Sequence, residues 1–275
     1  MKEREIKEIF LKTGSSKFNE FHHIYPRILE NLINSKSDYE KICIFEIGNR
    51  TYETIRAFLM VDERVVVYGL DIGNSANYNK IHRDKLLGDF PGRVHLATDT
   101  QGNKEVLSYT GKHAMSSYDG FDLVVDDGSH HNDHWLASFD VLSNYMKPEG
   151  VYVIEDIECM YTWESGKDTF IDRSKGFNLR QESYHLGLTL RKFLVEMIDV
   201  VNRDFLKRVQ MSFDNEGKIP RRINETTGNY SVLGRDDLVT SFRVYTNCVV
   251  FYFGYHLSKP KHLGGIDPME RYMVF

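Results

Sequence analysis

The stretch FDLVVDDGSHHNDH, residues 121–134, passes from a run of apolar residues into a cluster of acidic, hydroxyl and imidazole side chains. An apolar run of this length is typical of a strand that is buried on both faces. The residues at 132–146 then carry apolar side chains three and four positions apart, which predicts a helix. The stretch therefore predicts a strand, a polar loop at its carboxyl end and a helix.

The same unit of strand and helix recurs through the first half of the chain. Further apolar runs predict strands at 41–48, 64–73, 93–98 and 150–158. Segments with helical spacing lie at 51–60, 77–87 and 103–110, and KPEG at 147–150 predicts a turn before the last of these strands. Strands that alternate with helices predict an α/β fold, a doubly wound, Rossmann-like arrangement around a mostly parallel sheet.

The remainder of the chain departs from this alternation. Residues 238–256 contain two β-rich runs around Thr246 and Asn247, which predicts a C-terminal antiparallel hairpin. Residues 159–235 are more polar, with a helix expected at 186–207, and we expect them to form a helical cap over the sheet's C-terminal edge. A second independent domain is the alternative. We interpret 1–275 as a single domain with the following parts: an N-terminal helical lid segment (1–40), a cofactor-binding core (41–158), a substrate cap (159–235), and a hairpin and tail (236–275).

Composition limits the classes of partner. The 275 residues carry a net charge of −5 and show no basic stripe, so we expect no nucleic acid partner. No apolar run reaches the roughly 20 residues that span a bilayer. The N-terminal stretch lacks the pattern of a signal peptide, which predicts a cytoplasmic location. Cys43, Cys159 and Cys248 have no disulfide or CxxC spacing, and we interpret them as reduced thiols.

Acidic residues stand at the ends of four of the five predicted parallel strands. Ligands of open α/β sheets bind outside the carboxyl ends of the strands, so these positions predict a functional site. The acidic residues are Glu46, Asp71, Asp126, Asp127, Glu155 and Asp156.

The first two strand ends indicate the kind of cofactor. Asp71 stands where an acid would accept the ribose hydroxyls of an adenosine-containing cofactor. The turn GNRTYET, at 48–54, has one glycine where a dinucleotide fingerprint has three, which disfavours NAD. S-adenosylmethionine carries no phosphate and fits better, with Glu46 and Gly48 beside its amino-acid end. The other predicted cofactor-binding residues are Thr100, Gln101 and Asp126. For Asp126 the alternative is a role in orienting neighbouring residues, without contact to a ligand.

The runs FEIG, YGLDI, DDGSH and MKPEGVYVIEDIE together resemble the metal-dependent sugar O-methyltransferases of macrolide and polysaccharide biosynthesis. These are class I S-adenosylmethionine-dependent methyltransferases. The resemblance covers roughly residues 13–161 and resumes at SFRVYTNCVVFYF. It implies a methyltransferase fold, S-adenosylmethionine and Mg²⁺ as cofactors, and a sugar or glycoconjugate substrate (capsule, O-antigen or natural-product glycoside). It also makes a homo-oligomer plausible.

On the matching positions, the resemblance implies that Asp127 and Asp156 bind Mg²⁺ and that His130 is the general base. Asp127 thereby counts as catalytic, and Glu155 is either a further metal ligand or a neighbour of the site. The chemistry agrees, because oxygen ligands suit a hard cation and a neutral imidazole can take a proton from a sugar hydroxyl. A zinc pair of His130 and His134 is the alternative if both lie on one helix, and we expect His131 to be structural.

Several residues admit two interpretations. His22, His23 and Tyr25 could belong to a lid over the site or could simply pack against the core. The cap contains four aromatic residues for which we expect packing roles: Tyr161, Trp163, Phe170 and Tyr184. Two other functions stay open, namely a nicotinamide-dependent sugar oxidoreductase and a non-catalytic homologue that binds S-adenosylmethionine.

Overall fold

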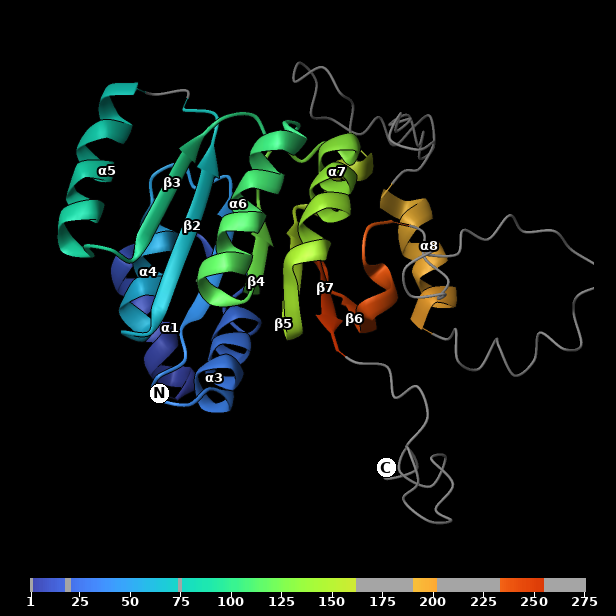
Figure 1. Cartoon of the computed structure of the whole chain (residues 1–275), viewed down its shortest axis with the longest axis horizontal. Coiled ribbons are helices and arrows are strands. Elements are labelled where there is room, and N and C mark those ends of the chain that lie inside the picture. The colour runs from blue at the N-terminus through green and yellow to red at the C-terminus, as the bar shows by residue number, and fades with distance from the viewer. Residues whose placement is uncertain (1, 18–20, 74–75, 162–189, 202–232, 255–275) are drawn as a thin grey trace, which may run out of the picture.

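The structure is a computed structural model that describes residues 2–17, 21–73, 76–161, 190–201 and 233–254. A seven-stranded sheet lies between two layers of helices (Figure 1). Its strand order is β3-β2-β1-β4-β5-β7-β6. The strands are β1 (Ile42–Ile47), β2 (Val65–Asp71), β3 (Val94–Thr98), β4 (Phe121–Asp126), β5 (Met146–Glu155), β6 (Val239–Val244) and β7 (Cys248–Phe253).

The first five strands are parallel, whereas β7 is antiparallel to both β5 and β6. This arrangement confirms the predicted doubly wound sheet with an antiparallel hairpin at its C-terminal side. The expected turn at Thr246 and Asn247 lies between β6 and β7.

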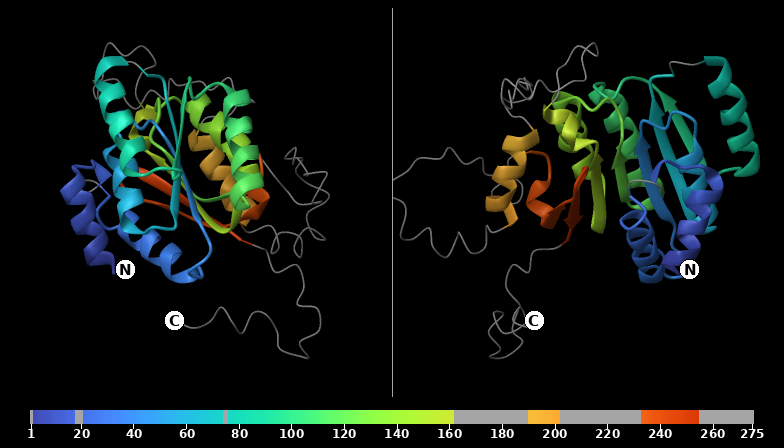
Figure 2. Two further views of the ribbon diagram at one scale, coloured as in Figure 1. Left: turned by 60° about the vertical axis from the view of Figure 1, so that its left-hand side comes forward. Right: turned by 180° about the vertical axis from the view of Figure 1, so that it is seen from behind.

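Helices cover both faces of the sheet, as Figure 2 shows from two further directions. One face carries α6 (Lys104–Tyr118), α7 (Asn132–Leu142) and α8 (Leu190–Val201). The other carries α1 (Glu3–Thr13), α3 (Tyr25–Ser35) and α4 (Glu53–Val61), and α5 (Ala76–Asp89) lies beside the edge strand β3. Short 3₁₀ helices are η1 (Ser143–Tyr145), η2 (Ile157–Tyr161) and η5 (Asp236–Leu238).

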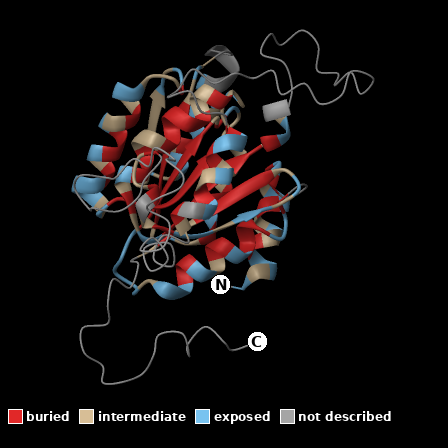
Figure 3. Ribbon diagram, turned by 90° about the vertical axis from the view of Figure 1, so that its right-hand side faces the viewer, coloured by how far each residue is buried: buried red, intermediate tan, exposed pale blue. Residues whose placement is uncertain are grey.

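The central strands are buried on both faces, which explains their nearly continuous apolar sequences (Figure 3). Along β1, Ile42 and Ile44 pack on the side of α3 and α4. Cys43, Phe45 and Ile47 pack on the side of α6 and α7. Cys43 and Cys248 are buried free thiols, and Cys159 is half-buried.

The order of the strands reverses at β1, since β2 lies on one side of it and β4 on the other. Gly48, which follows β1, has φ +84°. A Cβ atom at this position would lie 1.8 Å from the carbonyl oxygen of Asp127. The absence of a side chain at Gly48 therefore lets the ends of β1 and β4 approach closely. In an open α/β sheet, ligands bind at this point.

The predicted turn at 147–150 was wrong, because these residues belong to β5. The register between β4 and β5 shifts between Phe121 and Leu123, which makes this part of the strand irregular. Glu149 has φ +66°, and the ammonium of Lys147 donates to Asp122 at 2.7 Å. Residues 147–150 thus form an irregular part of β5 and not a turn that precedes it.

The helix expected at 186–207 is present as α8 over Leu190–Val201. Phe193 of α8 packs against Phe139 and Phe251, with ring centroids 5.1 and 6.0 Å away. Most of the predicted cap, including Trp163, Phe170 and Tyr184, lies outside the described residues, so the cap stays a prediction. Among the helices of the described ranges, none is both long and apolar enough to cross a membrane.

Candidate active site

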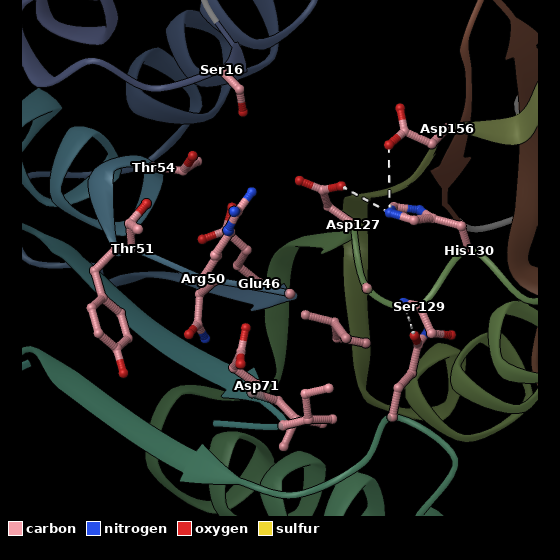
Figure 4. A pocket seen from close by; sticks show the side chains of 18 of the residues that line it. Ser16, Glu46, Arg50, Thr51, Thr54, Asp71, Asp127, Ser129, His130 and Asp156 are labelled. Carbon is pink, nitrogen blue, oxygen red and sulfur yellow. Dashed lines mark hydrogen bonds and ion pairs between the residues drawn. The ribbon is translucent and has the colours of Figure 1, made fainter. Parts of the chain in front are cut away.

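A cavity of about 730 Å³ lies at the carboxyl ends of the parallel strands (Figure 4). This is within the usual size range of small-molecule sites. Its wall includes most of the residues that the sequence predicts for the site: Glu46, Gly48, Asp71, Thr100, Gln101, Asp127, His130 and Asp156. Gly14 and Ser16, from the segment after α1, also line it.

The alternation of side chains along the strands brings several carboxylates together. Glu46 continues the row of Ile42 and Ile44, which faces α3 and α4. Glu155 continues the equivalent row of Val151 and Val153 on β5. Neighbouring parallel strands end at one edge, so these two buried acids and Asp127 lie on the same side of the sheet.

Asp127, His130 and Asp156 form a compact group that could hold a metal ion. One potential ligand atom from each lies within 4.8 Å of the others. His130 Nε2 is 3.5 Å from Asp156 Oδ2 and 4.0 Å from Asp127 Oδ1, and Figure 4 shows the three side chains pointing toward one another. His130 and Asp156 have φ +58° and +53°, a left-handed conformation that is costly for these residues and is common at functional sites.

Lys17 reaches this group from the segment between α1 and α3, although Lys17 itself was not among the predicted site residues. Its ammonium donates to Oδ2 of Asp127 and, at 2.6 Å, to Oε2 of Glu155. The hydroxyl of Tyr25 donates to the other oxygen of Glu155. The Glu155 carboxylate is therefore occupied by two protein donors, and it is not part of the group formed by Asp127, His130 and Asp156.

Burial and charge act against each other around Lys17. Burial alone would lower the pKa of Lys17, but the carboxylates of Glu155, Asp127 and Glu46 raise it above its ordinary value. Burial raises the pKa of Glu155, and the ammonium of Lys17 opposes that rise. Lys17 thus remains charged inside the protein, where it balances the negative charge of the site.

Three side chains of the cavity wall have buried polar atoms without hydrogen-bond partners among the described residues. These atoms are Oε2 of Glu46, both amide atoms of Asn49 and Nδ1 of His130. Burial raises the pKa of Glu46 to about 8, against the lowering effect of Lys17. Unsatisfied buried polar groups are rare and costly, so their position in the cavity indicates a polar ligand.

Asp71 ends β2 at the other side of the cavity. Its Oδ1 accepts a hydrogen bond from the backbone N–H of Gly73 at 2.9 Å, which fixes the carboxylate. This is the place in an open α/β sheet where an acid meets the ribose of a bound nucleoside.

Gln101 and Asp126 form a hydrogen-bonded support for the loop after β4. The Gln101 amide nitrogen donates to Asp126 at 2.7 Å and to Ser138 at 2.9 Å, and its oxygen accepts from the backbone of Ser129. Asp126 is fully buried and does not line the cavity, and its hydrogen bond from Gln101 fits the orienting role; its contact with the cofactor stays a prediction. Burial raises the pKa of Asp126 to about 8, although the hydrogen bond from Gln101 lowers it.

The other histidines lie apart from the group. His134 Nδ1 is 2.6 Å from Ser129 Oγ, and α7 begins at Asn132, so His130 precedes the helix and cannot form the alternative zinc pair on it. His131 is the residue before α7 and its side chain does not cap the helix, so its structural role stays a prediction. His22 and His23 are exposed, whereas Tyr25 is buried beneath the site and does not cover it.

The turn between β6 and β7 contributes a contact that the sequence did not indicate. Asn247 Nδ2 donates to Oδ1 of Asp156 at 2.8 Å. A lone asparagine in a predicted turn carries no signal of such a role, and neither does a lysine in the segment before α3. Only the topology of the sheet brings these two residues to the same site.

Comparisons with known proteins place this geometry among methyltransferases. No family model matches the chain. It is 28% identical over 164 residues to the mycinamicin VI 2″-O-methyltransferase of Micromonospora griseorubida, a match to 57% of this chain and 37% of that protein. It is 26% identical over 172 residues to the demethylmacrocin O-methyltransferase of Streptomyces fradiae, a match to 60% of this chain and 39% of that protein. The chain thus spans well under half the length of these curated relatives.

Solved structures of methyltransferases also superpose on this chain. MycE, a methyltransferase of the mycinamycin biosynthetic pathway solved with Mg, SAH and mycinamycin VI, superposes with a TM-score of 0.57 at 21% identity. The superposition covers 96% of this chain and 57% of MycE. A second MycE structure, with Mg and SAH, gives 0.59 at 22% identity over 90% and 54% of the two chains. This chain therefore has the class I methyltransferase fold, and the two proteins that it resembles in sequence are O-methyltransferases.

Proposed function

We propose that this chain is an S-adenosylmethionine-dependent, Mg²⁺-dependent O-methyltransferase that acts on a sugar hydroxyl of a saccharide or glycoconjugate. The observation that carries the proposal is the convergence of Asp127, His130 and Asp156 beside a cavity that also contains Asp71 and Glu46. Asp127 and Asp156 would bind the metal ion that orients the sugar, and His130 would take the proton of its hydroxyl. The other two lie where a nucleoside and an amino-acid group would bind.

The cavity fits S-adenosylmethionine. Asp71 would accept hydrogen bonds from the ribose hydroxyls, and the free Glu46 oxygen would accept one from the α-ammonium group. The unpartnered amide of Asn49 would gain a ligand contact in the same cavity. The bound cofactor would supply the methyl group.

The donor set also fits a hard divalent cation. Asp127 and Asp156 would hold Mg²⁺ with carboxylate oxygens, the ligands that this ion prefers. The ion, when bound, would orient two neighbouring hydroxyls of the sugar and lower the pKa of the one that is methylated.

His130 would take the proton of the acceptor hydroxyl. Its Nε2 atom faces Asp127 and Asp156, so it is the ring nitrogen closest to where the hydroxyl would lie. For Nε2 to accept a proton, the ring hydrogen must be on Nδ1, a buried atom without a hydrogen-bond partner among the described residues. A positioned base of this kind contributes roughly 10² to 10⁴ to the rate.

The substrate class rests on the relatives, whose names specify O-methylation of glycosides such as mycinamicin VI. Capsule, O-antigen and natural-product glycosides, and thus polysaccharide biosynthesis, belong to the proposal. A cytoplasmic location, a homo-oligomer and the absence of a nucleic acid partner also stay proposals that rest on the sequence. The oxidoreductase alternative is less favoured, because the turn after β1 lacks the glycines of a dinucleotide site and no relative above supports it.

The decisive experiment is a methyl-transfer assay with labelled S-adenosylmethionine across a panel of free, nucleotide-linked and macrolide-linked sugars. We expect one acceptor to gain a single methyl group in mass spectrometry. Binding of S-adenosylhomocysteine without transfer to any sugar would favour a non-catalytic homologue. Binding of NAD in place of S-adenosylhomocysteine would overturn the proposal.

A further inference from the structure

Each of the two carboxylates proposed to bind the cation has one oxygen that accepts a hydrogen bond and a second oxygen that faces His130. On Asp127, Oδ2 accepts from Lys17, and Oδ1 faces His130 Nε2. On Asp156, Oδ1 accepts from Asn247, and Oδ2 faces the same imidazole nitrogen. The two oxygens that face His130 Nε2 therefore converge before any ion is bound.

The contact to Asp156 comes from the turn of the C-terminal hairpin. Strand β7 pairs with β5 up to the position where Cys248 lies opposite Glu155. The preceding residue, Asn247, then lies beside Asp156, and its carbonyl accepts from the backbone N–H of Ile157 at 3.3 Å. The side chain of Asn247 thus holds Asp156 and its backbone carbonyl holds the next residue, Ile157.

This segment needs such support. Asp156 has φ +53°, a conformation that a non-glycine residue keeps only where the surroundings impose it. The side chain is 29% exposed, so packing alone does not fix its rotamer. The hydrogen bond from Nδ2 decides which carboxylate oxygen points toward His130.

We propose that Asn247 is a positioning residue that pre-forms the divalent-cation site by holding Oδ1 of Asp156. The inference rests on the proposed function, because that function assigns the ion to Asp127 and Asp156. Outer partners that orient metal ligands contribute on the order of 10- to 100-fold to metal affinity.

The charges around the site explain why a neutral amide suits this position. Lys17 and Glu155 form a buried pair that is neutral as a whole. Asp127 and Asp156 then leave two negative charges for a divalent cation. An amide donor orients Asp156 without cancelling either charge, whereas a second lysine would compete with the ion.

Metal binding, measured without substrate, tests this inference. Mg²⁺ affinity would be determined by calorimetry and Mn²⁺ affinity by electron paramagnetic resonance for the wild type, Asn247→Leu and Asn247→Ala. Thr246→Ala is the matched control, since Thr246 is exposed in the same turn. We expect both Asn247 variants to bind the ions about 10- to 100-fold more weakly. Affinity for S-adenosylhomocysteine should stay unchanged, and excess Mg²⁺ should restore turnover.

The outcomes separate this inference from the proposed function. A wild type that binds the ions together with folded Asn247 variants of equal affinity would overturn the inference and leave the function standing. A wild type that binds neither ion would overturn both. The alanine variant keeps the test valid if leucine prevents the hairpin from docking, because the smaller side chain introduces no steric conflict.

Discussion

The ammonium of Lys17 donates a hydrogen bond to the carboxylate of Glu155 at 2.6 Å, and the two side chains are only 1% and 2% exposed. This buried pair joins the segment after α1 to the end of β5. A buried ion pair adds little over a well-packed apolar pair, but the loss of one partner leaves an uncompensated charge in the interior. The folded state therefore depends on both residues being present.

Replacement of Lys17 by methionine should destabilise the fold by about 3 to 5 kcal/mol, because Glu155 loses its counter-ion. The free energy of unfolding in urea measures this change. Lys12→Met is the control, since Lys12 is exposed in α1. The double variant Lys17→Met/Glu155→Gln should regain part of the loss. Equal stability of Lys17→Met and Lys12→Met would contradict the assignment of this pair.

Replacement of Asp71 by alanine should weaken binding of S-adenosylhomocysteine by about 1 to 3 kcal/mol, the scale of hydrogen bonds to a charged acceptor. Calorimetry on the folded variant gives the affinity. Asp84→Ala, at an exposed position of α5, should bind like the wild type. If both variants kept full affinity, the ribose would have to bind elsewhere in the cavity.

Removal of divalent cations by EDTA should abolish methyl transfer, and added Mg²⁺ should restore it. S-adenosylhomocysteine should still bind to the chelated protein, because Asp71 and Glu46 lie at strand ends other than those of Asp127 and Asp156. Parallel activity and binding measurements in one buffer provide the check. Full activity in excess chelator would instead place the protein in a metal-independent class, with His130 as its base.

Replacement of His130 by alanine should lower turnover by roughly 10² to 10⁴, the usual contribution of a general base. The affinities for Mg²⁺ and S-adenosylhomocysteine should change little if His130 acts as the base. His131→Ala serves as the control, because His131 only precedes α7. A marked loss of metal affinity in His130→Ala would show that His130 is a ligand, and the base would then have to be another group.

Acidification should destabilise the fold through His95 on β3. Burial lowers the pKa of His95, and the neighbouring His113 lowers it further. The ring of His95 also stacks on Tyr68 at 4.6 Å between centroids, with Tyr118 beside it. A group with a lowered pKa takes up its proton first in the unfolded state, so stability is lost as pH falls below the ordinary histidine pKa of about 6.5.

Urea unfolding at several pH values between 8 and 5 would measure this effect. His95→Phe should lose less stability on acidification than the wild type, because phenylalanine does not titrate. His22→Phe, at an exposed position, should follow the wild type. Identical pH profiles for the wild type and His95→Phe would refute the role of His95.

Much of the fold could be predicted because its signals are local. The apolar runs and helical spacings depend on a few consecutive residues, and they identify β1 to β5, their helices and the hairpin. The acids at the strand ends were also predictable, since parallel strands bring their carboxyl ends to one edge. The turn signal at 147–150 misled because a short local pattern cannot distinguish a turn from an irregular strand.

The residues that complete the site could not be predicted from local signals. No local pattern pairs Lys17 or Asn247 with the acids. They approach the acids only after β7 has paired with β5 and the segment after α1 has packed against the sheet. The role of Gln101 depends likewise on its contacts with Asp126, Ser138 and Ser129. Asp126 is buried and does not line the cavity, because strand alternation turns its side chain into the core; its contact with the cofactor stays a prediction.

The placement of β7 between β5 and β6 has a consequence for the integrity of the sheet. Without β7, the buried part of β5 from Val151 to Glu155 would present unpaired backbone groups at an open edge, where other chains can add by edge-to-edge aggregation. The hairpin replaces this edge with β6, which is short and exposes Thr240, Ser241 and Arg243. A chain cut before residue 239 would consequently aggregate, and the hairpin acts as the sheet's protective border.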